Sequence, residues 1–302
     1  MVFRVTDALF NNRLVDQIAS QRQRLAQAQE QVATGRRINR IADDPLGTAA
    51  VIEIRASQTE LEQLKGNANS ADNILTAGDS ALDSYQRRLD RLRSLISQGI
   101  SGFTNDAGRR AIADEIDGLR QMILNQANSR SGNQYIFGGT RQDAPPFDPV
   151  TAAPNTGTAS PSLIQIEPDA APIAASVVAD TIFSNTGGNI FDTLTAASTA
   201  IRGSGDPVAD EATLNSALTQ LETFAEQAGN ARVILAKGLE AVEAAGERIE
   251  SDTLALETSA QRIESADFVK SSVQMVEAQR ALEAILQSGS ILKRRSLLDL
   301  LG

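Results

Sequence analysis

Cysteine and histidine are both absent from the 302 residues of this chain. Without cysteine there are no disulfides, thiolate nucleophiles or cysteine-ligated metals. Without histidine the chain lacks the commonest general base and the commonest transition-metal ligand. Tryptophan is missing too, and aromatic residues make up only 4%, so small and aliphatic side chains carry the apolar content. That composition suits narrow helical seams, and we expect no enzyme activity, no metal and no cofactor.

Positive charge is also scarce, because 28 basic residues face 38 acidic ones and leave a formal net charge of -10. This balance argues against nucleic acid, whose affinity for proteins comes largely from lysine and arginine contacts to phosphate. No run of eighteen apolar residues exists, so we expect no membrane insertion. The first seven residues lack the apolar core of a cleaved secretory signal. The protein is therefore expected to stay inside the cell or to leave by a route that cleaves nothing.

Apolar residues recur every three or four positions from Leu214 to Ile263, which predicts one long helix with a narrow seam. The same spacing predicts a second long helix over about residues 46–98. Two helices of similar length, joined through an insertion, pack most simply antiparallel. We expect a mainly α protein, an elongated antiparallel helical bundle or coiled-coil rod. Both terminal helices would lie at one end of the rod, with a small β-rich or irregular inserted domain at the other.

Between the two long helices the residue pattern predicts several shorter elements of different kinds. Asn105 or Asp106 is placed to begin a third helix that ends near Arg130, and Tyr135–Phe137 between glycines resembles a strand or hairpin arm. From about residue 142 to 205 proline is frequent, and two short apolar runs, 163–166 and 177–183, are expected to be strands. A helix is expected over 190–201. We therefore divide the chain into five parts. These are a first terminal segment (1–45), a first rod part (46–141), an inserted outer domain (142–205), a second rod part (206–264) and a last terminal segment (265–302).

Each end of the chain carries an amphipathic helix of its own. The first is expected over about 7–33, with Gly35 capping it. Near the other end the apolar register slips by one residue after Ile263, which turns the stripe by about 100° and predicts a new helix from Asp267 to about Gly289, with Ser265 as its cap. Exposed seams at both ends would form an assembly surface. The residues assigned to it are Leu14, Ile18, Leu25, Val32, Phe268, Met275, Leu282, Ile285, Leu292, Leu297 and Leu298.

Three features invite a chemical interpretation, and each has a structural one that we prefer. Asp43 and Asp44 could form an acid–base pair, but adjacent residues rarely converge on one atom, and Asp44 before Pro45 is typical of a helix start. Gly138–Gly139 could hold a phosphate, but no further part of a phosphate loop follows. The carboxylates scattered over 142–205 lack the fixed spacing of a calcium site.

Two segments at the two ends resemble one known family. Gly35-Arg36-Arg37-Ile38-Asn39 followed by Asp43-Asp44-Pro45 is similar to the N-terminal signature of the bacterial flagellin family. Residues 262–268 (Arg-Ile-Glu-Ser-Ala-Asp-Phe), with Ser296-Leu297-Leu298, are similar to its C-terminal signature. The resemblance covers roughly the first 140 and the last 90 residues. Asp44-Pro45 and residues 132–139 are more similar to the members at the hook–filament junction than to the filament protein.

The resemblance implies a flagellar structural subunit, exported unfolded to the cell exterior with help from a cytoplasmic chaperone. It implies contacts with copies of the same chain in a ring, with a hook-associated protein on the hook side and with flagellin on the filament side. Two alternatives stay open. The chain could be filament flagellin itself, or a secreted membrane-active protein that uses residues 268–301, with Lys293-Arg294-Arg295, as an interfacial helix.

Overall fold

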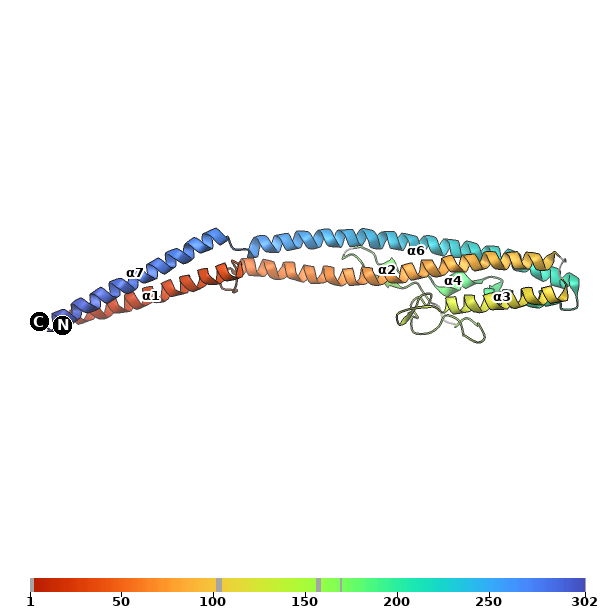
Figure 1. Cartoon of the computed structure of the whole chain (residues 1–302), viewed down its shortest axis with the longest axis horizontal. Coiled ribbons are helices and arrows are strands. Elements are labelled where there is room, and N and C mark those ends of the chain that lie inside the picture. The colour runs from red at the N-terminus through yellow and green to blue at the C-terminus, as the bar shows by residue number, and fades with distance from the viewer. Residues whose placement is uncertain (1–2, 102–104, 156–158, 169, 302) are drawn as a thin grey trace. The chain divides into compact units, whose positions relative to one another are not determined.

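The computed structural model describes residues 3–101, 105–155, 159–168 and 170–301, and within these ranges it describes side chains from residue 12 to residue 290. Helices dominate the described chain, which confirms the predicted mainly α class (Figure 1). The chain divides into two compact units. The first comprises Met1–Glu60 with Ser251–Gly302, and the second comprises Leu61–Glu250. The boundaries of both units fall within the two longest helices.

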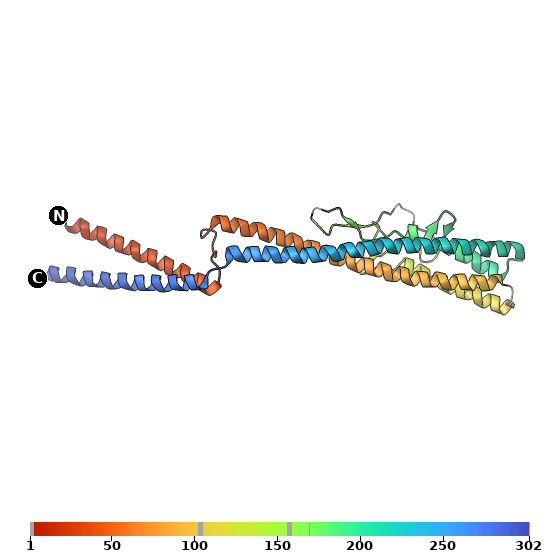
Figure 2. The same cartoon turned by 90° about the horizontal axis from the view of Figure 1, so that it is seen from above.

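The first unit is built from the two ends of the chain. Helix α1 (Phe3–Thr34) and helix α7 (Phe268–Leu301) lie side by side, with both chain ends at the same end of the pair (Figures 1 and 2). The first residues of α2 (Pro45–Ile100) and the last residues of α6 (Pro207–Glu264) complete this unit. Two helices that are distant in sequence thus provide most of its packing.

The second unit contains the rest of α2 and α6 and everything between them. Its strands form three separate two-stranded antiparallel ladders. In chain order the elements between α2 and α6 are α3 (Asp106–Ala127), β1 (Arg130–Ser131), β2 (Gln134–Tyr135), β3 (Leu163–Ile164), β4 (Ile173–Ala174), α4 (Ala179–Phe183), β5 (Ser184–Asn185), β6 (Gly188–Asn189) and α5 (Ile190–Arg202).

Within the second unit α2 and α6 run antiparallel, as the matched lengths of their seams predicted. Arg232 on α6 contacts Asp79 on α2 at 2.8 Å, while Arg93 on α2 contacts Glu222 on α6 at 2.9 Å. Residue numbers rise on one helix as they fall on the other, which defines the direction. Gly238 allows a close approach here, because a Cβ at this position would lie 3.0 Å from the Leu75 side chain. The alanine- and leucine-rich seam gives the thin core that the composition favoured.

An aromatic cluster around Phe183 closes this core beside α2. The Phe183 ring lies 4.8 Å from that of Tyr85, 5.7 Å from Phe137 and 5.9 Å from Phe147. Phe191 packs against Phe147 at 4.9 Å, and all five rings are buried. Three of the five rings come from residues 142–205, so that segment shares the helical core of its unit. Its assignment as a separate outer domain remains a prediction.

Several caps lie where the sequence placed them. Gly35 has a φ of +68° at the end of α1, and its amide donates to the carbonyl of Gln31. Pro45 is the first residue of α2, and the Asp44 carboxylate accepts from the Gly47 amide at 2.9 Å. Asn105 caps α3 through the Gly108 amide. These confirmed caps show that local chemistry fixed the starts and ends of the helices.

Other boundaries were predicted wrongly. Residues 177–183 are not a strand, since Ala179–Phe183 form the short helix α4, and the strand expected over 163–166 is only Leu163–Ile164. The cap of α7 is Asp267, which accepts from the Lys270 amide at 3.0 Å, whereas Ser265 forms a β-bridge with Arg36. Helix α7 also continues past Gly289 to Leu301. Gly289 lies inside this helix and packs closely on α1, since a Cβ there would lie 3.0 Å from the Leu14 side chain.

Candidate assembly site

The seam between α1 and α7 contains most of the residues that the sequence assigned to assembly. Among the predicted residues, Leu14, Ile18, Leu25 and Val32 of α1 and Met275, Leu282 and Ile285 of α7 are half-buried. Phe268 is different, because 64% of it is exposed. Leu292, Leu297 and Leu298 lie outside the residues whose side chains are described. Whether these positions contact another chain stays a prediction.

Small and polar residues also line this seam. Ala28 of α1 and Ala278 of α7 are buried, and both border an open groove whose other lining residues are mainly glutamine, arginine and glutamate. The Ser271 hydroxyl, also buried, donates to the Gln31 side-chain oxygen at 3.3 Å. The seam is therefore narrow and thinly apolar. Packing of this kind contributes little free energy per helix turn, so further burial by another chain would stabilise it.

An apolar stripe on α7 was missed in the sequence. Val269, Val273 and Val276 are 72%, 52% and 41% exposed, and they recur at intervals of four and three residues on a face away from the seam. Val15 of α1 and Leu286 of α7 are also largely exposed. The three valines do recur at helical spacing in the sequence. The seam that contains Met275 and Leu282 has more apolar residues, and it drew attention away from them. Exposed apolar side chains gathered in this way mark interaction surfaces.

The family-signature loop forms a second feature, which we call the clasp: residues 35–45 together with 263–266. The Arg37 amide donates to the Glu264 carbonyl at 2.7 Å, and its guanidinium donates to the Ile263 carbonyl at 2.9 Å. The Ala266 amide donates to the Gly35 carbonyl at 2.9 Å. Arg37 thus satisfies the last carbonyls of α6, which have no partner within the helix, and its positive charge is favourable there.

The two aspartates of the clasp are occupied by hydrogen bonds to backbone amides. The Asp43 carboxylate accepts from the amides of Asn39 and Arg40 at 3.1 and 2.9 Å. Asp44 accepts from the Gly47 amide and from Arg37 at 3.0 Å, and these bonds lower the pKa of Asp44 below its ordinary value of 3.8. The stabilising contribution of Asp44 is therefore present above pH 3.8 and is lost as the pH falls through the lowered pKa. Capping explains Asp44, as preferred above, and hydrogen bonds within the loop occupy Asp43.

The clasp leads to a first prediction. Arg37→Ala removes the donors to the Ile263 carbonyl and to Asp44, so the last turn of α6 should fray. We expect amide hydrogen exchange near the end of α6 to rise by roughly tenfold, the effect of about 1.4 kcal/mol. Mass spectrometry of exchanging peptides measures this. Arg22→Ala, an exposed arginine in α1, is the matched control and should leave exchange there unchanged. Equal protection of α6 in both variants would contradict the assigned role of Arg37.

The glycine pair of the second unit has a structural explanation. A Cβ on Gly138 would lie 2.6 Å from the Arg141 carbonyl oxygen, and one on Gly139 would lie 2.3 Å from that of Ser160. The amides of Gly138 and Thr140 already donate to the carbonyls of Tyr135 and Ser160. These glycines permit tight backbone packing, and the neighbouring amides do not point at a free phosphate site.

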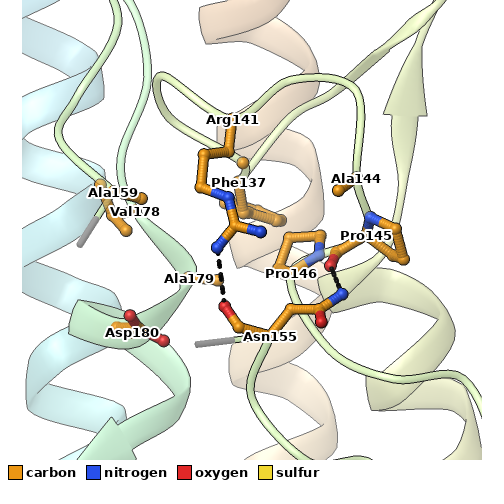
Figure 3. Close-up of a pocket in the computed structure, with 11 residues that line it drawn as sticks. Phe137, Arg141, Ala144, Pro145, Pro146, Asn155, Ala159, Val178, Ala179 and Asp180 are labelled. Atoms are coloured by element: carbon orange, nitrogen blue, oxygen red, sulfur yellow. Dashed lines mark hydrogen bonds between the residues drawn. The ribbon is translucent and has the colours of Figure 1, made fainter. Parts of the chain in front are cut away.

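Gly138 is one of the residues that line a small pocket. Figure 3 shows this pocket with Arg141, Asn155 and Asp180 among its other lining residues. Arg141 donates to the Asn155 carbonyl at 3.1 Å, and the Asn155 side chain donates to the Pro145 carbonyl at 2.8 Å. These hydrogen bonds hold the loop together. Within the described residues, no group of three acidic residues could hold a metal ion. No described helix is long and apolar enough to cross a membrane.

The geometry defines a class before any comparison: a mainly helical protein whose two terminal helices pair and whose clasp loop hydrogen-bonds to the end of α6. Residues 8–142 match the family model described as the bacterial flagellin N-terminal helical region. Over these residues the chain is similar to the bacterial flagellins.

The curated relatives include hook-associated proteins and flagellins. Flagellar hook-associated protein 3 of Salmonella typhimurium is 28% identical over 132 residues, which cover 43% of this chain and 42% of that protein. The flagellin of Listeria monocytogenes is 26% identical over 254 residues, which cover 83% of this chain and 82% of that protein. The chain thus matches less than half the length of the Salmonella relative and about four-fifths of the Listeria one.

Solved structures share the fold. A putative flagellar hook-associated protein from Vibrio parahaemolyticus superposes with a TM-score of 0.67 at 16% identity, over 74% of this chain and 100% of that one. FlgL of Xanthomonas campestris gives a TM-score of 0.61 at 16% identity, over 69% and 99% of the two chains. These likenesses confirm the helical fold with its small sheets.

Proposed function

We propose that this chain is a structural subunit of the bacterial flagellum, an adaptor that connects the hook side to the filament. The observation that carries the proposal is the α1–α7 pair. Its seam is thin, and several large apolar side chains of the same unit remain exposed on other faces. Surfaces of this kind suit a subunit whose ends are buried between neighbouring copies. The similarity to hook-associated protein 3 supplies the particular position in the flagellum.

The proposed partners follow from that position. Copies of the chain form a homo-oligomeric ring, a hook-associated protein lies on the hook side, and flagellin lies on the filament side. The subunit leaves the cell through the flagellar export apparatus, guided by a cytoplasmic chaperone, and acts outside the cell. It performs no catalysis. The absence of cysteine and histidine, together with the hydrogen-bonded state of Asp43 and Asp44, supports a purely structural role.

Filament flagellin is the second candidate, and one observation favours it. The match to the Listeria flagellin extends over 254 residues, nearly twice the 132 residues matched in the Salmonella hook-associated protein. Helical ends that pair would serve either role equally well. The two candidates differ in the number of copies per flagellum and in the effect of removing the chain.

Deleting the coding sequence separates the candidates. For an adaptor we expect hooks without filaments, and full-length flagellin released into the medium because monomers have no surface on which to polymerise. Electron microscopy and immunoblotting of the medium measure both, and restoring the gene is the control. Normal filaments in the deletion strain would contradict the adaptor role. Bare hooks without any flagellin in the medium would instead identify the chain as the filament protein.

A further inference from the structure

A groove beside the clasp carries a charge that is unusual for this chain. It is lined by three arginines and one glutamate, Arg36, Arg40, Arg55 and Glu264, together with isoleucines that include Ile41 and Ile52. Three positive charges against one negative charge leave the lining positive, whereas the whole chain has a net charge of -10. We call this feature the arginine groove. All its residues belong to the first unit.

The arginines are only partly neutralised within the chain. Glu264 serves both Arg36, at 3.5 Å, and Arg55. Arg40 contacts Glu30 at 3.1 Å but is 72% exposed. Ion pairs this exposed are worth at most about 1 kcal/mol, so a better-buried carboxylate can replace them. The groove therefore has room for a further negative charge.

Large apolar side chains at and beside the groove face solvent. Ile41 is 70% exposed and Ile52 is 61% exposed, while Leu46, close by in the sequence, is 85% exposed. The groove is open to solvent and offers an occupant about 170 Å³ of space. An occupant that fits must combine an apolar side chain with neighbouring carboxylates, preferably on a helix that presents both on one face.

The chain itself presents such a face. Among the described residues 251–264, Leu254 is the large apolar residue that is mostly exposed, at 64%. Glu257 follows it by three residues and Glu250 precedes it by four, so both acidic side chains share its face of α6. We call this the acidic face. Its charge and its single apolar side chain complement the arginine groove.

The acidic face cannot fill the groove of its own chain. Leu254 precedes Glu264 by ten residues, which is about 15 Å along a helix, and Glu264 already lines the groove. We propose that the arginine groove of one copy binds the acidic face of α6 of a second copy of this chain. Because groove and face are different surfaces, the contact is head-to-tail and repeats from copy to copy, as closed rings require. The inference rests on the proposed structural role and adds the contact that joins adjacent copies.

The absence of cysteine makes a crosslinking test direct. Ile41→Cys and Leu254→Cys are introduced together, intact flagella are isolated and oxidised, and the chain is followed by non-reducing gel and immunoblot. A disulfide requires Cα atoms less than about 7 Å apart, so only a true contact reacts. We expect a ladder of dimers and higher multimers that collapses on reduction. The matched control combines Ile41→Cys with Val208→Cys, a valine of the other unit that is 78% exposed, and should give no ladder.

Three results would overturn this contact: monomers only, a crosslink within one chain, or an adduct with a protein of different mass. The same immunoblot distinguishes a failure of the proposed flagellar role from a failure of the proposed contact between copies. If the unsubstituted chain is absent from isolated flagella, the flagellar role itself fails. If the chain is present and the ladder is not, only the contact fails.

If the cysteine substitutions keep the chain out of the flagellum, an exchange of charges tests the proposed contact instead. Arg40→Glu and Glu257→Arg should each lower the amount of chain in isolated flagella at least severalfold. The double variant should restore it, because the proposed Arg40–Glu257 pair then forms again with its two charges exchanged. Failure of the double variant to recover, with both single variants impaired, would contradict the contact.

Discussion

Replacing Phe183 with alanine is expected to lower the melting temperature of the chain by roughly 10 °C. Phe183 is fully buried and contacts the rings of Tyr85, Phe137 and Phe147. Removing a buried phenylalanine side chain typically costs about 3–5 kcal/mol, through lost apolar burial and the cavity left behind. For a unit of this size each kcal/mol corresponds to about 2–4 °C. Circular dichroism during heating measures the change.

Phe268→Ala is the matched control, because it makes the same substitution at a side chain that is 64% exposed. Surface substitutions usually change stability by less than about 0.5 kcal/mol. Similar melting temperatures for the two variants would show that the aromatic cluster does not hold the second unit together. The expected difference also bears on residues 142–205, since Phe183 is one of the residues that tie this segment to the helical core.

The second large effect concerns the pairing of the two chain ends. Leu282 is half-buried in the α1–α7 seam, and Leu282→Asp would both remove apolar contact and place a carboxylate there. The combined cost is about 2–3 kcal/mol, which corresponds to roughly a 30- to 150-fold larger population of separated ends. Limited proteolysis of the purified chain, with the cleavage sites identified by mass spectrometry, should show faster cutting in both terminal helices.

Leu286→Asp, one turn further along α7, provides the comparison. Its side chain is 46% exposed, so the same substitution should change cleavage less than threefold. The second unit should melt normally in both variants, because neither residue belongs to its core. Equal cleavage of Leu282→Asp and the unsubstituted chain would mean that the seam does not hold the ends together.

Much of the fold could be predicted because its helices follow a regular spacing and their caps follow local rules. Gly35, Asp44 and Asn105 act within three or four residues of themselves, so one sequence was enough to place them. The register slip after Ile263 likewise marked the real break between α6 and α7. These features depend on neighbours along the chain.

The errors arose where distant residues decide the outcome. Residues 177–183 form a short, mostly apolar run interrupted by Asp180 and Thr181, and such a run does not distinguish a buried strand from a buried helix. Phe183 is turned into a core made by α2 and by residues 137 and 147, and that packing gives α4. Gly289 was predicted to end the last helix, but Leu14, from the opposite end of the chain, packs against it.

The assembly site was only partly predictable for the same reason. The seam register identified Leu14, Leu25, Met275 and Leu282 as apolar positions, but their half-burial depends on the pairing of α1 with α7. The arginine groove escaped notice because its parts come from the clasp loop, α2 and the end of α6. No periodicity within a single element brings Arg36, Arg55 and Glu264 together.

The position of the chain along the flagellum tests the central proposal most directly. Val150 is 87% exposed, and Val150→Cys would add the single thiol of this cysteine-free chain. Intact flagella are labelled with maleimide-coated gold and viewed by electron microscopy, with flagella carrying the unsubstituted chain as the background control. The adaptor role predicts gold confined to a short zone where the hook meets the filament. Gold distributed along the whole filament would contradict it.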